Sequence, residues 1–144
     1  MPNEKRRALS RELSVVARRW RTRLDERLRA LEMSQARWAV LNAIRHAGGG
    51  LSQKALAEQA GIEPATLVRM IDALEAQDLV ERHTSQDDRR INLVHLRPAA
   101  IPLIAQMDEI DAALSQELLQ DYGREDLRAL VELLQSLRSK LDHG

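Results

Sequence analysis

Hydrophobic residues recur at helical spacing in a long stretch near each end of the chain. Near the amino terminus, steps of three and four residues connect Leu9, Leu13, Val16, Trp20, Leu24, Leu28 and Leu31. Near the carboxyl terminus, the same steps form a heptad seam of Leu127, Leu130, Leu134, Leu137 and Leu141. Such a repeat places its side chains along one face of a helix. The pattern therefore predicts a long amphipathic helix at both ends.

A second helix is indicated after the first. Ser34 is a good N-cap residue, and Trp38, Leu41 and Ile44 follow it on one helical face. Gly48-Gly49-Gly50 ends this helix, because consecutive glycines lose too much backbone entropy to remain helical. Leu51, directly behind the glycines, is an isolated apolar residue that could form a short strand.

Two short helices with a tight turn between them are predicted next. The first begins at Ser52 and ends at Ala60, Gly61 makes the turn, and the second has Pro64 in its first turn and runs to about Gln77. The positions expected in their shared core are Leu56, Ala57, Ala60, Ile62, Leu67 and Met70. This is a helix-turn-helix pattern, which occurs in DNA-binding proteins and also in other helix pairs.

A hairpin follows the helix pair. Two β-prone runs, residues 79–84 and 91–96, flank the polar turn 85–90. Pro98 then opens a fifth helix, whose apolar side carries Ile101, Ile104, Met107, Leu114 and Leu118. A helix-turn-helix followed directly by a hairpin is a winged helix. The expected fold is therefore mostly α with a small β-hairpin wing (α+β), one intertwined domain with the parts 1–33, 34–97 and 98–144.

The net charge of the 144 residues is zero, with 22 basic and 22 acidic side chains, which argues against a nucleic-acid binder. The charges are unevenly distributed. Residues 1–29 hold ten basic and four acidic groups, whereas residues 98–144 hold four basic and nine acidic groups. Opposite charge at the two ends favours their association, within one subunit or between two. The alternative is that both regions are simply well-solvated helix faces.

Composition excludes several classes of protein. Cysteine is absent, which excludes disulfides, thiolate metal sites and cysteine redox sensors. The aromatic residues are only Trp20, Trp38 and Tyr122, so the core must be aliphatic. No apolar run approaches the ~18–20 residues that span a bilayer, so we expect a cytoplasmic protein, and a nucleoid-associated one if it binds DNA.

The sequence also supports neither an enzyme nor a metal protein. No nucleophile elbow and no phosphate-binding glycine loop is present. No pair of histidines has the spacing of a helical metal site among His46, His83, His95 and His143. We therefore expect no catalytic activity, no bound metal and no cofactor.

Candidate DNA contacts lie on the helix pair. Arg69 in its second helix can donate two hydrogen bonds to guanine in the major groove. Thr66 precedes Arg69 by three residues and shares its face. Ser52 and Gln53 begin the first helix, where backbone amides and short polar side chains can hold phosphate. Simple helix capping is the alternative for these two residues.

The turn of the hairpin reads Asp87-Asp88-Arg89-Arg90. Two arginines at such a tip can enter a minor groove or bind phosphates. The adjacent aspartates can hold the guanidinium groups by paired hydrogen bonds. The alternative is an ordinary solvated turn, for which Asn-Gly or Asp-Gly would be more typical.

The run from Ser34 to Leu96 resembles the MarR family of bacterial transcription regulators, and in particular its SlyA-like branch. The matching stretches are WRTRLDERLRALEMSQARWAVL, LAEQAGIEPATLVRMIDALEAQDLVER and DDRR. The resemblance implies an obligate homodimer built from the first and last helices. It also implies a base contact by Arg69, a base or backbone contact by Thr66, a minor-groove contact by Arg90 supported by Asp88, and a phosphate contact by Arg89.

The same resemblance implies small aromatic anions, similar to salicylate, as effectors. The positions that resemble their pocket are Arg18, Trp20, Ala36, Trp38 and Asn42, to which Met70 is added. A cation beside two aromatic rings suits an aromatic carboxylate. The chain departs from the branch at three of these positions: Ala36 and Asn42 stand in place of more capable polar residues, and Met70 replaces a smaller polar side chain. The alternative for both tryptophans is a place in the helical core stripes.

Together these features predict a homodimeric, double-stranded-DNA-binding regulator that recognises an inverted repeat. Its half-sites would lie about one helical turn apart, roughly 34–36 Å. Repression by blocking promoter access, relieved by an aromatic anion, is the expected mode of action. The alternative is a winged-helix protein–protein interaction module without DNA binding. Its motivation is the neutral total charge and the presence of Asp72 and Glu75 near Arg69.

Overall fold

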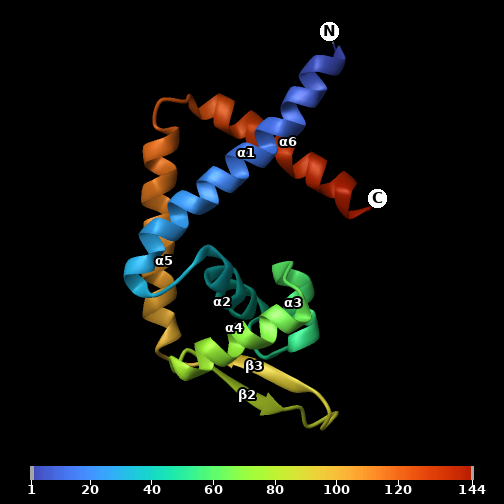
Figure 1. The fold of residues 1–144 in the computed structure, drawn as a ribbon, viewed down its shortest axis with the longest axis vertical. Helices are drawn as coiled ribbons and strands as arrows, with labels where there is room; N and C mark the ends of the chain where they lie inside the picture. Colours follow the sequence, from blue (N-terminus) through green and yellow to red (C-terminus); the bar gives the residue numbers. More distant parts are fainter. Residues whose placement is uncertain (1, 144) are drawn as a thin grey trace. The chain divides into compact units, whose positions relative to one another are not determined.

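Helices form both ends of the chain in the computed structural model, which describes residues 2–143, and the strands of a small sheet come from the middle of the sequence (Figure 1). The ends of the predicted outer parts, Met1 and Gly144, lie outside the described residues. The elements are α1 (Pro2–Leu28), the 3-10 turn η1 (Arg29–Leu31), α2 (Gln35–Ala47), β1 (Leu51–Ser52), α3 (Gln53–Ala60), α4 (Pro64–Ala76), β2 (Val80–Thr84), β3 (Asn92–Leu96), α5 (Ala100–Leu119) and α6 (Arg124–Asp142). The mostly helical winged-helix fold that the sequence predicts is confirmed.

The helix ends follow the signals read from the sequence. The hydroxyl groups of Ser34 and Ser52 accept hydrogen bonds from backbone amides three residues ahead, at 3.2 and 3.1 Å, and cap α2 and α3. Gly48 and Gly61 follow these helices with φ of 70° and 68°, a conformation that costs glycine little. Pro64 is the first residue of α4. These helix boundaries therefore follow from the residues that stand at them.

Three predicted boundaries are corrected. The first apolar stripe does not continue as α-helix to Leu31, because α1 ends at Leu28 and a 3-10 turn follows. Ser52 is the cap of α3 and a residue of β1, so the helix itself begins at Gln53. Pro98 does not begin the fifth helix, which starts two residues later at Ala100.

The sheet has three antiparallel strands in the order β1-β3-β2, with β3 in the centre. The hairpin of β2 and β3 has the predicted position, with Val80 opposite Leu96. Strand β1 adds to it through the pairing of Leu51 with Val94. Gly50 precedes this strand against the imidazole of His95, so that an added Cβ would overlap with the ring. Because β1 directly precedes α3 and pairs with β3, this short strand connects the helix pair with the base of the wing.

The core of the helix-turn-helix unit is aliphatic, as predicted. The side chains that are fully or almost fully buried in α3 and α4 are Leu56, Ala57, Leu67, Ile71 and Leu74. Ala60, Ile62 and Met70, which were expected in this core, are only half-buried. Ile71 and Leu74 continue the series from Leu67 in steps of four and three residues, so the buried face of α4 points one position beyond Met70.

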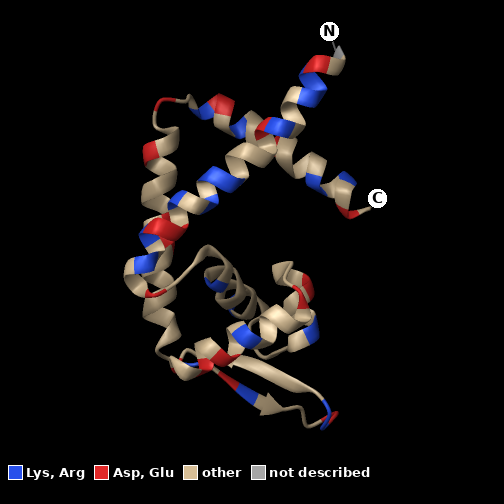
Figure 2. Ribbon diagram, in the orientation of Figure 1, with Lys and Arg blue, Asp and Glu red and all other residues tan. Residues whose placement is uncertain are grey.

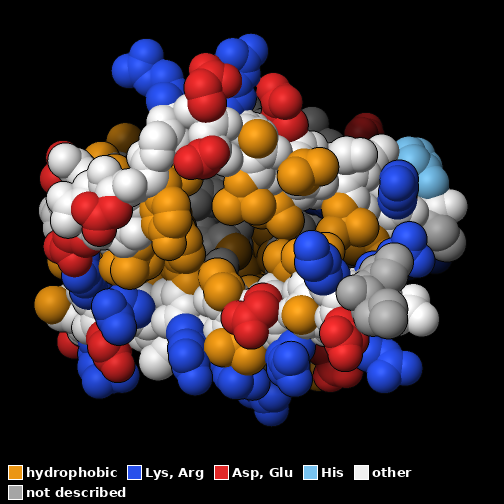
Figure 3. Space-filling model, turned by 90° about the horizontal axis from the view of Figure 1, so that it is seen from above, with side chains coloured by type: hydrophobic (Ala, Val, Ile, Leu, Met, Phe, Trp, Pro, Cys, Tyr) orange, Lys and Arg blue, Asp and Glu red, His pale blue; other side chains and the backbone are white. Residues whose placement is uncertain are grey.

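The chain forms two compact units, residues 1–111 and residues 112–144. In the first unit, α1 buries Leu24 and Leu28, whereas Leu9 and Val16 of the same stripe are exposed. In the second unit, α6 buries none of its residues, and its large exposed hydrophobic residues are Leu130, Val131, Leu133, Leu134, Leu137 and Leu141. Hydrophobic side chains are accordingly visible among the charged ones in the space-filling view (Figure 3). None of the helices in residues 2–143 has an apolar stretch long enough to cross a bilayer.

Candidate nucleic-acid interface and ligand pocket

The outer face of α4 presents Arg69 to solvent. Leu67 and Ile71 on either side of it point into the core, which directs the arginine outward. Within the described part of the chain, Arg69 forms no ion pair, so its guanidinium donors are available to a ligand. Thr66, one turn earlier, is half-buried at the edge of the same face. The helix therefore offers a free cation where the sequence predicts a base contact.

Arg82 on β2 connects the wing with the helix pair, and sequence reasoning missed it. Its Nη2 donates to Oδ1 of Asp72 at 2.7 Å and to the carbonyl oxygen of Val68 at 3.4 Å. Its Nη1 donates to Oε1 of Glu75 at 3.2 Å, and its Nε to Oε1 of Gln53 at 2.9 Å. The signal in the sequence was a basic residue at an inward strand position, two residues after the buried Val80.

These contacts change the roles available to two predicted phosphate ligands. The side-chain oxygen of Gln53 accepts a hydrogen bond from Arg82, which fixes the amide group and leaves its NH₂ group, the donor that a phosphate requires, available. The hydroxyl of Ser52 accepts from the amide of Ala55, so the capping interpretation holds for it. Its own proton remains available as a donor. Both residues lie at the amino-terminal end of α3, where the sequence placed them.

The tip of the wing holds one arginine in place. Arg90 donates from its backbone amide and its Nε to Oδ1 of Asp88, at 3.0 and 3.1 Å, and from Nη2 to Oδ2 at 3.3 Å. The side chain of Arg90 is nevertheless 91% exposed. Hydrogen bonds from Arg90 hold the pKa of Asp88 below its ordinary value, so the carboxylate stays charged. The wing therefore carries a fixed and exposed arginine, and the exposed Arg89 directly precedes it in the sequence. Figure 2 shows basic and acidic residues together at the end of the hairpin.

The base of the wing contains a small polar cluster. His83 Nε2 lies 2.8 Å from Oε1 of Glu81, and the rings of His83 and His95 meet edge to face at 5.0 Å between centroids. The hydrogen bond with His83 lowers the pKa of Glu81 from its ordinary value, and Arg97 adds a weaker electrostatic effect. No group of three potential metal ligands exists among residues 2–143.

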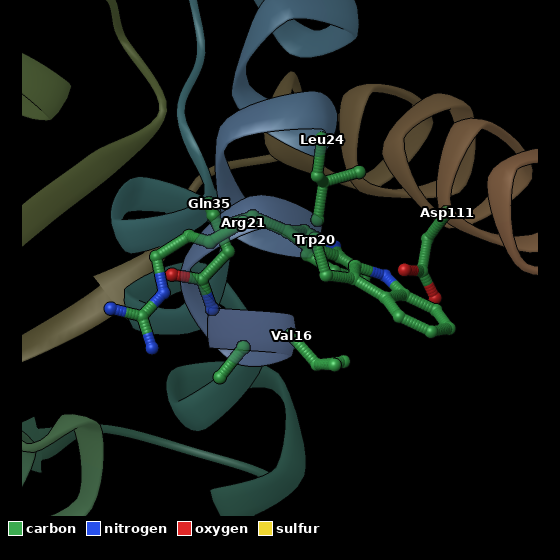
Figure 4. A pocket seen from close by; sticks show the side chains of 8 residues that line it. Val16, Trp20, Arg21, Leu24, Gln35 and Asp111 are labelled. Carbon is green, nitrogen blue, oxygen red and sulfur yellow. The ribbon is translucent and has the colours of Figure 1, made fainter. Parts of the chain in front are cut away.

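A pocket of about 300 Å³ lies in the first unit, between α1, α2 and the part of α5 that ends at Asp111 (Figure 4). Its side chains include Val16, Trp20, Arg21, Leu24, Gln35, Trp38 and Asp111. Trp20 and Trp38 are thus brought together as the sequence predicted. The other predicted effector residues, Arg18, Ala36, Asn42 and Met70, do not line this pocket.

Two acidic residues of α5 complete the surroundings of the tryptophans. Asp108 accepts a hydrogen bond from Trp38 Nε1 on Oδ1 at 3.2 Å and forms an ion pair through Oδ2 with Arg45 Nη1 at 2.9 Å. Arg45 also donates to the side-chain oxygen of Asn42. Burial raises the pKa of Asp111 above its ordinary value, and the charge of Asp108 raises it further. Sequence reasoning missed both acids.

A signal for Asp111 was present in the sequence. The buried residues of α5 are Ala100, Ile104, Met107 and Leu114, and Asp111 stands four residues after Met107, where the next apolar residue of that series would be expected. An acidic side chain in an apolar stripe destabilises the fold unless its charge is compensated by a partner in the protein or by a ligand. Its position therefore distinguishes it from the solvated acids of the same helix.

Comparison with known proteins identifies the fold's relatives. A sequence model described as the MarR family matches residues 31–91. The solved structure of the transcriptional regulator PA3341 is 33% identical, covers 94% of this chain and 99% of its own, and has a TM-score of 0.82. A mutant of MarR from E. coli complexed with operator DNA is 27% identical over 90% of this chain and 93% of its own, with a TM-score of 0.81. BldR from Sulfolobus solfataricus, 23% identical, covers 100% of this chain and 99% of its own with a TM-score of 0.85 and shows the same fold.

Proposed function

The chain belongs to the MarR family of transcriptional regulators, and from this premise we propose that it binds double-stranded DNA sequence-specifically. In this proposal α4 lies in the major groove and the wing tip reaches an adjacent minor groove. A relative of similar fold has been solved with operator DNA, which supports this class of partner. Assignment to the SlyA-like branch and a location on the nucleoid are parts of the proposal.

The observation that carries the proposal is the contrast between two arginines on the same surface. Arg82 is fully engaged by Asp72 and Glu75, whereas Arg69 on the outer face of α4 has no ion-pair partner among the described residues. A free guanidinium on an exposed helix face suits bidentate recognition of guanine. The exposed Arg90, held by Asp88, supplies a second contact at the wing.

The alternative, a protein–protein interaction module, loses one of its two motivations. It was based partly on Asp72 and Glu75, which were expected to place negative charge beside Arg69. Both carboxylates instead pair with Arg82, so their charges are compensated within the winged helix. The neutral total charge also carries less weight, because the basic residues gather on α1 and the acidic excess lies beyond residue 97 (Figure 2).

The homodimer is supported by the exposed hydrophobic side chains of α6. A helix that buries none of its residues but carries an apolar heptad seam is stable in water only when another surface covers the seam. Leu134 and Leu137, both in that seam, are 41% and 38% exposed. We expect sedimentation to give a dimer at micromolar concentration. Leu134→Asp shifts it to monomers, and a wild-type monomer contradicts the proposal.

As a dimer, the protein binds an inverted repeat with half-sites roughly 34–36 Å apart. Repression through occupation of a promoter is the simplest consequence of such binding. Release by a small ligand requires that the ligand favour dimers whose winged helices have another spacing. The pocket beside Trp20 and Trp38 is the site at which we place this ligand.

The experiment that tests DNA binding is a fluorescence anisotropy titration with duplexes selected from the organism's own genomic fragments. Wild-type protein is expected to bind the selected duplex more tightly than a shuffled one, and Arg69→Ala is expected to reduce that difference. Arg128→Ala, which removes an exposed arginine of α6, is the matched control and should leave the difference unchanged. Equal affinity of the wild type for selected and shuffled duplexes contradicts the proposal.

A further inference from the structure

The pocket beside the two tryptophans has an acidic end. Asp111 lines it and, among the described residues, forms no hydrogen bond or ion pair. Its neighbour Asp108 is different, because Trp38 and Arg45 both donate to it. One of the two acids is therefore compensated within the protein, and the other is left to a ligand. A half-buried carboxylate without a partner attracts a positive charge.

The walls of the pocket suit the same kind of ligand. Trp20 and Trp38 supply aromatic surface, and Val16 and Leu24 supply aliphatic surface. The electron-rich face of an indole attracts organic cations, and more strongly than the other aromatic rings. A volume of about 300 Å³ is at the lower end of the range for small-molecule sites.

The basic residues do not compensate Asp111. Arg21 lines the pocket, but its guanidinium points away from Asp111, on the opposite side of the Trp20 ring (Figure 4). Arg18, the cation expected to hold an aromatic carboxylate, is not part of the lining. An anion would therefore meet Asp111 without a facing cation at that end of the pocket.

We propose that this pocket binds a small organic cation with an aromatic body, and that Asp111 is its counter-ion. The ammonium group lies between the Asp111 carboxylate and the indole of Trp20, and the apolar body contacts Val16 and Leu24. The role of this cation as an effector rests on the proposed function. The binding of a cation rests only on the residues of the pocket. The expected aromatic anion becomes the competing outcome of the test.

The test compares three probes of the same size by isothermal titration calorimetry with the full-length chain. They are phenyltrimethylammonium, its neutral isostere tert-butylbenzene and the anion salicylate. We expect saturable binding of the cation with an affinity at least tenfold above that of the other two. Tighter binding of salicylate, or no saturable binding of the cation at millimolar concentration, overturns the proposal.

Two variants assign the binding to this pocket. Asp111→Asn is expected to weaken binding of the cation about 10- to 100-fold, because the quaternary ammonium, which has no N–H to donate, loses its ion pair with a half-buried carboxylate. Glu109→Gln removes the same charge from an exposed position of the same helix and should change affinity less than twofold. Trp20→Ala, followed by calorimetry because it removes a fluorophore, should also weaken the cation. Unchanged affinity in both pocket variants overturns the proposal.

The two proposals fail in distinguishable ways, because probe binding is measured without DNA. Cation binding that depends on Asp111, in a protein that binds no duplex, contradicts only the regulator function. Specific duplex binding by a protein that does not bind the cation contradicts only the proposal that the ligand is an organic cation.

Discussion

Replacing Arg82 with methionine removes the charged connection between the wing and the helix pair while keeping an unbranched stem in its place. The side chain of Arg82 is 20% exposed, and its guanidinium donates to Asp72, Glu75, Gln53 and the carbonyl of Val68. Since these acceptors lie on α3 and α4 and the arginine itself lies on β2, the loss affects the relative placement of all three elements. We expect Arg82→Met to lower both the free energy of unfolding and the affinity for DNA.

The magnitude follows from the exposure of the partners. Asp72 and Glu75 are 62% and 44% exposed, so each ion pair contributes only about 0.5–1 kcal/mol. The hydrogen bond to the neutral Gln53 contributes about 1 kcal/mol. Together they predict a loss of about 2–3 kcal/mol. For a chain of this size that corresponds to a decrease in Tm of about 4–12 °C.

The assay is chemical denaturation of both proteins at the same protein concentration, because the stability of a dimer depends on concentration. Arg97→Met is the matched control. Its guanidinium lies 3.9 Å from Glu81 at an exposed position, so its loss should change stability by less than about 0.5 kcal/mol. A double-mutant cycle with Asp72→Asn isolates the shortest ion pair. Equal destabilisation by the two arginine variants, or none by either, refutes the reasoning.

Three further predictions concern the proposed contacts. Arg69→Ala should cost about 1–3 kcal/mol and relax specificity at one base position of each half-site, measured with a panel of single-base duplex variants. Arg90→Ala should weaken all duplexes alike and reduce the slope of log affinity against log salt by about 1, in anisotropy titrations. Affinity for phenyltrimethylammonium should fall as the pH decreases through the pKa of Asp111. Burial and the charge of Asp108 raise that pKa, so the loss begins at higher pH than for an ordinary aspartate. Calorimetry that finds constant affinity from neutral pH to below the ordinary aspartate pKa contradicts this assignment.

The local structure could be predicted from the sequence because its causes are local. Ser34 and Ser52 cap helices through amides only three residues away, and Gly61 makes the turn through its own φ. The Arg90–Asp88 contact spans two residues and could be expected from the tip sequence alone. Signals of this kind need no knowledge of how distant segments pack.

The contacts that define the pocket and the base of the wing could not be predicted from such local signals, because they connect distant segments of the chain. Trp38 and Asp108 are 70 positions apart, and Arg82 and Gln53 are 29 apart, so only the folded chain reveals their pairing. The same limit explains why Arg18 was expected in the pocket and Arg21 is found there. Arg18 and Arg21 are three residues apart, so their side chains lie on nearly the same face of the helix, about 60° apart around its axis. A small difference in the placement of the helix therefore decides which of the two arginines lines a cavity.

The most direct test of the central claim is a salt titration of duplex binding by wild-type protein and by an Arg69→Ala, Arg90→Ala double variant. The wild type is expected to bind a duplex selected from its own genome with an affinity that falls as the salt concentration rises. The double variant should lose the preference for that duplex over a shuffled one while remaining folded by circular dichroism. Duplex binding by the wild type that is indistinguishable from background, or a double variant with full preference, would contradict the claim that α4 and the wing tip recognise DNA.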